Sequence, residues 1–249
     1  MSNIHLPDDE RQRIEDSAAG YHGVYNDENI RNITWISNQI VAHAQNHDEI
    51  LELGLGDGTT TRIFQENFKQ VTTLDGSSIL IDKFKEDNPD LNSVDLVCTF
   101  FEEYNPGKTF QNIAMCNVLE HVYDPGFIIE HYKKWLAPGG RFFISVPSAT
   151  SLNRRIGFEA GLLDDLFAFQ EQDYILGHRR YYSSETIVEF LKDCGLTIHR
   201  VEGVALKVIT TGQMQKLNFD DNIHQALLKI GVDYPELTTM VYIEASVNS

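Results

Sequence analysis

The chain has 249 residues and a formal net charge of −17. This length is sufficient for the buried core of one α/β domain with insertions, whereas the negative charge disfavours a nucleic-acid backbone or an anionic membrane surface as a partner. Because no basic and then apolar leader opens the chain, and no apolar run is long enough to span a bilayer, we expect an unexported, cytoplasmic protein.

The first predicted strand, Ile50 to Leu55, follows an N-terminal segment of helical character and runs into three glycines at alternate positions, Gly54, Gly56 and Gly58. Glycine has no Cβ and tolerates positive φ, so a backbone of this kind lets N–H groups approach a ligand where the next helix begins. Thr59 occupies the place where a dinucleotide-binding fingerprint needs its last glycine. This difference weakens a nicotinamide or flavin interpretation.

Two acidic residues mark the first two predicted strands. Glu52 lies inside the first strand, two positions before the first glycine, and Asp75 closes the second strand, Gln70 to Leu74. A carboxylate at the tip of the second strand is well placed to accept hydrogen bonds from the hydroxyls of a ribose. The alternative for Asp75 is an ordinary strand-end cap.

Further along the chain, apolar runs of strand length alternate with helical stretches, which predicts a doubly wound, mostly parallel α/β sheet. The later strands are expected at Val94 to Cys98, Ile113 to Cys116, Arg141 to Val146, Thr197 to Val204 and Thr239 to Val247. Helices are expected at Thr60 to Asn67, Ser78 to Asp87, Pro125 to Trp135 and Ser184 to Cys194, the last with an N-cap at Ser183 or Ser184.

Several motifs follow one another in an order typical of one enzyme family. The glycine run and the acid after the second strand are followed by "LEHV" at 119–122, by the turn "LAPGG" at 136–140 and by "GHRRYY" at 177–182. In this order and spacing, the chain resembles the class I S-adenosylmethionine-dependent methyltransferases over about residues 48–206. The "LEHV" and "GHRRYY" elements are similar to those of members that modify small molecules and sugars.

This resemblance implies a seven-stranded, Rossmann-like sheet with two late antiparallel strands, in a single domain that spans residues 1–249. Residues 48–147 would form the cofactor-binding core, and residues 1–46 a helical cap on it. The segments 148–182 and 207–237 are expected to be helical lid insertions over the substrate, at the sheet edge where ligands bind in open α/β folds.

The implied cofactor is S-adenosyl-L-methionine, with S-adenosyl-L-homocysteine as the product. The three glycines would approach its methionyl part, and Asp75 its ribose. The resemblance places further residues along the cofactor: Glu52, Gly76, Ser77, Phe100, Phe101, Asn117 and Val118. Because many relatives carry an aspartate where this chain has Phe100, we expect adenine recognition here to rest on stacking and backbone contacts.

Two histidines are candidates for the general base, His121 after the fourth strand and His178 in the first insertion. An imidazole with a pKa near neutrality is able to take the proton of a hydroxyl or ammonium acceptor as the methyl group arrives. The candidate substrate contacts are Tyr21, Tyr25, Arg179 and Tyr182.

A divalent metal site is the alternative chemistry for the same histidines. Asn117-x-x-Glu120-His121, with the distant His178, is similar to the E-x-x-E-H and His arrangement of some metal-dependent RNA-end methyltransferases. Here Asn117 replaces the first glutamate, which removes one anionic ligand. A metal site and an RNA substrate are therefore ranked behind the general-base mechanism. The metal ligands therefore stay unknown at this stage.

We therefore expect an S-adenosylmethionine-dependent methyltransferase that acts on a hydroxyl or amine of a small molecule, with a sugar-derived compound or a secondary metabolite as the acceptor. Two alternatives stay open: a quinone-type or metal-dependent O-methyltransferase, and a binding subunit that has kept the fold and lost turnover. The expected partner is the small-molecule substrate, without nucleic acid or membrane. The oligomeric state is open, with a homodimer as one alternative.

Overall fold

The computed structural model describes residues 6–20, 27–91 and 93–247. Within these ranges seven strands form one sheet in the order β3-β2-β1-β4-β5-β7-β6. The neighbours from β3 to β5 pair in parallel, and β7 runs antiparallel to both β5 and β6. The predicted doubly wound, mostly parallel, seven-stranded sheet is confirmed. The strands are β1 (Glu49–Leu53), β2 (Gln70–Asp75), β3 (Val94–Cys98), β4 (Phe110–Cys116), β5 (Leu136–Pro147), β6 (Leu196–Leu206) and β7 (Thr238–Val247).

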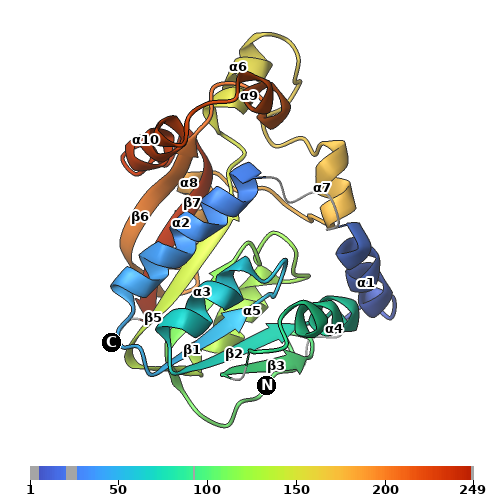
Figure 1. Cartoon of the computed structure of the whole chain (residues 1–249), viewed down its shortest axis with the longest axis vertical. Helices are drawn as coiled ribbons and strands as arrows, with labels where there is room; N and C mark the ends of the chain where they lie inside the picture. The colour runs from blue at the N-terminus through green and yellow to red at the C-terminus, as the bar shows by residue number, and fades with distance from the viewer. Residues whose placement is uncertain (1–5, 21–26, 92, 248–249) are drawn as a thin grey trace.

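Helices cover both faces of the sheet (Figure 1). Ile36 of α2 and Phe64 of α3 belong to an apolar core on one face, whereas Ile128 of α5 and Ile187 of α8 belong to a second core on the other face. The helices of the described residues are α1 (Glu10–Gly20), α2 (Asp27–His43), α3 (Thr59–Asn67), α4 (Ser78–Asp87), α5 (Pro125–Lys133), α6 (Leu152–Glu159), α7 (Glu171–Leu176), α8 (Ser184–Asp193), α9 (Thr211–Leu217) and α10 (Asp221–Gly231).

The central strands are buried on both sides. In β1, Ile50 packs into the first core and its neighbour Leu51 into the second, and both side chains are fully buried. Successive residues of a strand point to opposite faces, and parallel sheets with helices on both faces have strands that are apolar throughout. This burial makes the strand ends a rigid platform for the loops that follow them.

The observed elements differ from the predicted ones in several bounds; β4, for example, begins at Phe110 and not at Ile113. β1 ends at Leu53 because Gly54, with a φ of 86°, turns the chain out of the sheet. β5 begins at Leu136, which pairs with Phe110, and the "LAPGG" turn lies inside the strand as an irregularity before Arg141 pairs with Asn112. The predicted N-cap of α8 is Ser183, whose hydroxyl accepts a hydrogen bond from the Thr186 N–H.

Three helical segments lie outside the bare sheet. α1 lies beside α4 and α7 at one side of the molecule, and α10 packs along β6 (Figure 1). Helices thus occur in the predicted cap and in both predicted insertions, while the role of a lid stays a prediction. Tyr21 and Tyr25, the predicted substrate contacts of the cap, lie outside the described residues. None of the described helices is both long and apolar enough to cross a bilayer.

Candidate active site

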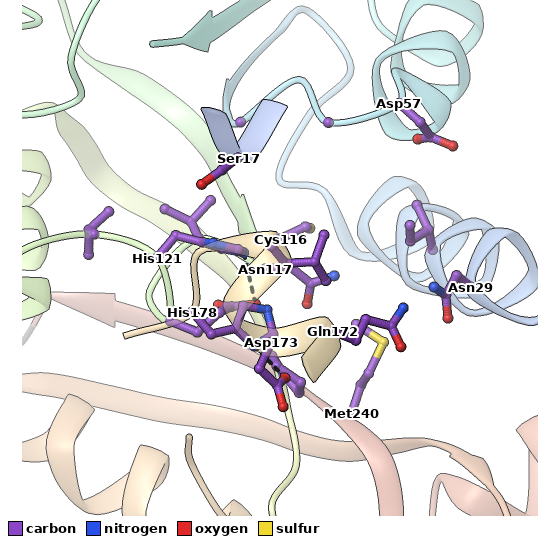
Figure 2. Close-up of a pocket in the computed structure, with 18 of the residues that line it drawn as sticks. Ser17, Asn29, Asp57, Cys116, Asn117, His121, Gln172, Asp173, His178 and Met240 are labelled. Carbon is purple, nitrogen blue, oxygen red and sulfur yellow. Dashed lines mark ion pairs between the residues drawn. The ribbon is translucent and has the colours of Figure 1, made fainter. Parts of the chain in front are cut away.

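A cavity of about 420 Å³ opens at the carboxyl ends of the central strands. This volume is within the range of sites that bind small molecules. Its wall includes residues that follow β1, β2, β3 and β4, and residues of α1, α2 and the segments after β5 and β6. Figure 2 shows Asn29, Asn117, His121 and Gln172 around the same cavity, although they come from three different parts of the chain: α2, the turn after β4 and α7.

The glycine loop between β1 and α3 borders this cavity with its backbone. Gly54, Gly56 and Gly58 have φ values of 86°, 55° and 76°, a region that favours glycine. Gly54 and Gly56 line the cavity, whereas Gly58 does not. A Cβ on Gly58 would collide with the ring of Phe84 in α4. This third glycine is therefore required by helix packing.

Asp75 connects the glycine loop to the tip of β2. Its carboxylate accepts hydrogen bonds from the Leu55 and Ser77 backbone N–H groups, both at 2.8 Å. Burial raises the pKa of Asp75 above its ordinary value, although these N–H donors favour the charged form. A carboxylate has about four lone-pair sites, so it is able to accept further hydrogen bonds from a ligand. Asp75, Gly76 and Ser77 all line the cavity.

Glu52 lies beneath the loop and is not part of the cavity wall. It is 2% exposed, and its Oε2 accepts hydrogen bonds from the hydroxyls of Thr61 at 2.6 Å and Thr73 at 2.7 Å. Burial raises the pKa of Glu52 to about 8. The Glu52 side chain connects β1 to α3 and β2. Because it does not line the cavity, this geometry gives it no direct contact with a ligand there.

The residues after β3 form another part of the cavity wall. Phe100 and Phe101 both line it, and the guanidinium of Arg11 in α1 lies 4.5 Å from the centroid of the Phe100 ring. Glu15 of α1 accepts hydrogen bonds from the Ser77 hydroxyl and the Ser78 N–H at the start of α4. α1 is thus fixed over this end of the cavity by contacts with both α4 and the loop after β3.

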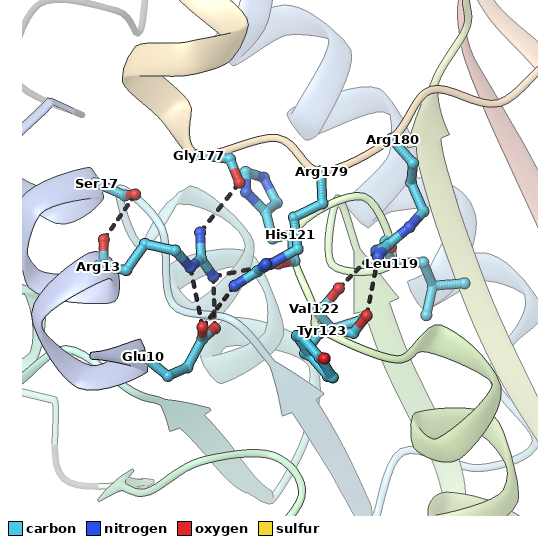
Figure 3. A network of polar contacts seen from close by, with 10 residues as sticks. All are labelled: Glu10, Arg13, Ser17, Leu119, His121, Val122, Tyr123, Gly177, Arg179 and Arg180. Carbon is cyan, nitrogen blue, oxygen red and sulfur yellow. Dashed lines mark hydrogen bonds and ion pairs between the residues drawn. The ribbon is translucent and has the colours of Figure 1, made fainter. Parts of the chain in front are cut away.

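The arginines of the "GHRRYY" element hold the "LEHV" segment in place. Figure 3 shows the carboxylate of Glu10 between the guanidinium groups of Arg13 and Arg179. Both arginines also donate to the backbone carbonyl of His121, and Arg180 donates to the carbonyls of Leu119, Val122 and Tyr123. Arg179, predicted to contact the substrate, is engaged in this network and does not line the cavity.

The two tyrosines of the same element have different surroundings. Tyr182 is 7% exposed, packs into the core near Phe190 and does not line the cavity. Tyr181 does line it, and its hydroxyl donates a hydrogen bond to Asp173 Oδ1 at 2.7 Å. The predicted substrate contact at Tyr182 is therefore one residue away from the tyrosine that faces the cavity.

His121 and His178 come together although 57 positions separate them in the chain. Their ring centroids are 4.7 Å apart, with the rings at 74° to each other. His178 Nδ1 lies 2.9 Å from Asp173 Oδ1. Burial lowers the pKa of His121 to about 3, and the nearby His178 and Arg13 lower it further. His121 is therefore neutral at physiological pH, with one ring nitrogen able to accept a proton or a metal ion.

Glu120 lies beside this histidine pair and lines the cavity. It is 1% exposed, and neither carboxylate oxygen has a hydrogen-bond partner among the described residues. Burial raises the pKa of Glu120 to about 7, while the nearby His178 and Arg180 oppose this shift. Asn117 and Val118, at the end of β4, complete this part of the wall.

The sequence profile of a family described as "Methyltransferase domain" matches residues 25–201, more than half of the chain. The chain belongs to this methyltransferase family. The resemblance to class I S-adenosylmethionine-dependent methyltransferases is thereby confirmed, and S-adenosylmethionine is the cofactor at the level of the family. No curated protein matches the chain in sequence.

Solved methyltransferase structures share the fold of this family member. N-methyltransferase NodS from Bradyrhizobium japonicum WM9, in complex with S-adenosyl-L-homocysteine, is 15% identical with a TM-score of 0.61, and the match covers 97% of this chain and 100% of NodS. The DhpI–SAH complex is 14% identical with a TM-score of 0.61, covering 96% and 95%. The glycopeptide N-methyltransferase MtfA, complexed with S-adenosyl-L-methionine, is 15% identical with a TM-score of 0.58, covering 87% of each chain.

Several residues of this methyltransferase site were not found from the sequence. Glu10, Arg13 and Glu15 lie on α1 with the spacing of an ordinary solvated helix face, so their long-range contacts leave no local signal. Tyr181 lies within the "GHRRYY" element, and Asp173 lies shortly before it. Asp173 and His178 are five positions apart in the sequence. This spacing indicates a contact between them only once the turn after α7 is known.

Proposed function

We propose that this protein transfers a methyl group from S-adenosylmethionine to a hydroxyl or amine of a polar small molecule. The observation that carries the proposal is that the glycine loop, Asp75 and the histidine pair line one continuous cavity. A methyl donor and an acceptor must meet in line at a short distance, and a shared cavity that excludes water is the protein's main contribution to such a displacement.

In this proposal the cofactor lies along the carboxyl ends of β1, β2 and β3. The backbone at Gly54 and Gly56 approaches the methionyl part, and Asp75 accepts hydrogen bonds from the ribose hydroxyls. Phe100 supplies an aromatic face to the adenine, and the Arg11 guanidinium, outside the cavity wall, packs against the Phe100 ring. The remaining wall residues assigned to the cofactor are Gly76, Ser77, Phe101, Asn117 and Val118.

The acceptor end is polar, which supports a sugar-derived compound or a secondary metabolite over a quinone. Lys207 pairs with Glu28 at 3.2 Å and donates to the Thr211 hydroxyl at 3.0 Å, and these three residues line the cavity. Further polar side chains on the wall are Asn29, Asn32, Asn153, Arg154, Gln170 and Gln172. An apolar quinone tail would displace water from these polar groups without replacing its hydrogen bonds, which costs free energy.

Transfer to a hydroxyl or ammonium group releases one proton at the acceptor. His121 and His178 are the residues that we assign to this end of the cavity, because each imidazole offers a ring nitrogen there. NodS and MtfA are both N-methyltransferases, so an amine stays in the proposal beside a hydroxyl. The net charge of −17 continues to favour a small molecule over nucleic acid as the partner.

The test is a turnover assay that detects S-adenosylhomocysteine by mass spectrometry, with sugars, amino sugars and hydroquinones as the acceptor panel. We expect product with a polar acceptor.

Lys207→Met should raise the KM for that acceptor about tenfold, the loss of one charge-assisted contact, and leave cofactor affinity within about twofold. Lys216→Met, in the α9 helix that follows Lys207 and outside the cavity wall, is the control. Cofactor binding without product from any acceptor would support a binding subunit, and product from hydroquinones alone would support a quinone enzyme.

A further inference from the structure

Three groups that accept hydrogen bonds or bind metals converge at one point of the cavity wall. A carboxylate oxygen of Glu120 and one ring nitrogen each of His121 and His178 all lie within 4.8 Å of one another. The individual distance between His121 Nε2 and Glu120 Oε1 is 3.9 Å. Glu120 and His121 are consecutive residues in the turn after β4, whereas His178 follows α7. The fold therefore brings His178 to the other two residues.

The carboxylate of Glu120 has no donor that would stabilise its burial. Its two oxygens have no hydrogen-bond partner among the described residues, and the side chain is 1% exposed. A proton on Glu120 would remove its charge, but the carboxyl group would still lack a hydrogen-bond partner among the described residues, because His121 Nε2 is 3.9 Å away, beyond hydrogen-bond distance. Burial of an unpaired carboxylate is strongly unfavourable unless a cation or a metal ion compensates it.

The surroundings of His178 orient it as a ligand. Its Nδ1 lies 2.9 Å from Asp173 Oδ1, so Nε2 is the nitrogen left for a ligand. Asp173 is itself fixed by the Tyr181 hydroxyl and by the Gln170 N–H, both at 2.7 Å. A carboxylate that holds the far nitrogen of a histidine is the usual outer partner of a metal-binding imidazole.

We propose that Glu120, His121 and His178 bind one divalent transition-metal ion at the acceptor end of the cavity. Two imidazole nitrogens and one carboxylate oxygen suit zinc, manganese, iron, cobalt or nickel, whereas magnesium and calcium prefer oxygen ligands throughout. Side-chain movements of less than about 1 Å would bring the three atoms to the ~2.0–2.2 Å typical of such bonds. The cavity supplies the path of entry, because all three residues line it.

The inference rests on the proposed function and narrows its acceptor to a compound with a hydroxyl group. A hydroxyl bound to the ion loses its proton to water more easily, because the ion stabilises the alkoxide. The alkoxide oxygen then forms a bond to the methyl carbon of the cofactor. The carbon–sulfur bond breaks with its electron pair on sulfur, which leaves S-adenosylhomocysteine and the methyl ether.

Metal binding is measurable without turnover. The full chain, dialysed against EDTA and then against buffer, is titrated with Co²⁺ while calorimetry and the visible absorption of cobalt are recorded. We expect one ion per chain in the cavity. Glu120→Gln should weaken this binding at least about 100-fold, and Asp173→Asn about 10- to 100-fold as an outer partner. Glu52→Gln is the matched control, because it replaces another buried carboxyl group that lies outside the cluster and the cavity wall, and it should bind cobalt as the wild type does.

The result that overturns the inference is cobalt binding that is absent in the wild type or equal in Glu120→Gln and the wild type. Turnover that is unchanged in EDTA would also overturn it while leaving the proposed methyl transfer intact. If Glu120→Gln instead raised the KM for an amine acceptor in metal-free enzyme, the carboxylate would serve an ammonium group. Cobalt binding without methyl transfer from any acceptor would contradict the proposed function and keep the metal site.

Discussion

Two buried carboxylates on neighbouring strand ends have opposite surroundings. Glu52 in β1 is 2% exposed and accepts hydrogen bonds from two threonine hydroxyls, whereas Glu120 after β4 is 1% exposed and has no donor among the described residues. Burial raises the pKa of both, to about 8 and about 7. The difference separates a carboxyl group that the protein itself supplies with hydrogen-bond donors from one that, in our proposal, binds a metal ion.

The two regions also differ in how they are assembled. The region under the glycine loop uses Glu52, Thr61, Thr73 and Asp75, which lie within one short stretch of the chain and connect β1, α3 and β2. The region at the acceptor end combines α1, the turn after β4 and the segment around α7. The first region supports the glycine loop and is built from one short stretch of the chain. The second region depends on contacts between distant segments.

The largest effect is expected from Gly56→Val, a change in the glycine loop that should disrupt cofactor binding. The substitution places a branched side chain on a cavity-lining residue with a φ of 55°, so the backbone no longer approaches the cofactor and also becomes strained. Calorimetry should show S-adenosylmethionine binding at least about 100-fold weaker, because close approach of the loop is lost.

Gly107→Val is the control for that strain. Gly107 has a φ of 66°, a Cβ on it would meet nothing within 4 Å, and it lies outside the cavity wall. Left-handed backbone at a non-glycine residue costs about 1–2 kcal/mol, so both variants should unfold at similarly lowered temperatures. Equal cofactor affinity in the two variants would mean that the loop does not hold the cofactor.

A smaller effect is expected from Glu52→Gln, in the region under the glycine loop. The folded-state pKa of Glu52 is raised from an ordinary value of 4.5 to about 8, so the stability it contributes is present below about pH 4.5 and is lost as the pH rises through 8. The neutral glutamine should therefore be more stable than the wild type at pH 9 by about 1 to 3 kcal/mol, with little difference at pH 4. Thermal unfolding at the two pH values measures this.

Cofactor affinity provides the decisive readout for the same variant. Because Glu52 is bonded to two threonines and does not line the cavity, S-adenosylmethionine should bind within about twofold of the wild type. A tenfold loss would show that Glu52 acts on the cofactor, as the sequence alone suggested, and the contrast with Glu120 would disappear.

The cofactor half of the molecule was largely predictable from the sequence. Alternate glycines after an apolar strand permit positive φ, and an acid at the next strand tip lies beside them where the two strands are neighbours in a parallel sheet, so Gly54, Gly56 and Asp75 meet at one cavity. The sequence did not separate Gly58 from the other glycines, because its role depends on the ring of Phe84, which only the packing of α4 brings close.

The acceptor half was predictable only in part. Histidines at His121 and His178 were singled out, and the fold brings them together. The direction in which Arg179 and Tyr182 point was not predictable, because in a loop no periodicity fixes which side chain faces a cavity. Arg179 is attracted to Glu10 on α1, and nothing in the local sequence indicates that contact.

A crystal structure of the full chain with S-adenosylhomocysteine tests the central claim most directly, that the loop and the histidine cluster serve one reaction. The account predicts the ribose hydroxyls within about 3 Å of the Asp75 carboxylate, the homocysteine part along Gly54 and Gly56, and the sulfur facing the space beside His121 and His178. A ligand bound elsewhere, or a sulfur directed away from both histidines, would contradict it.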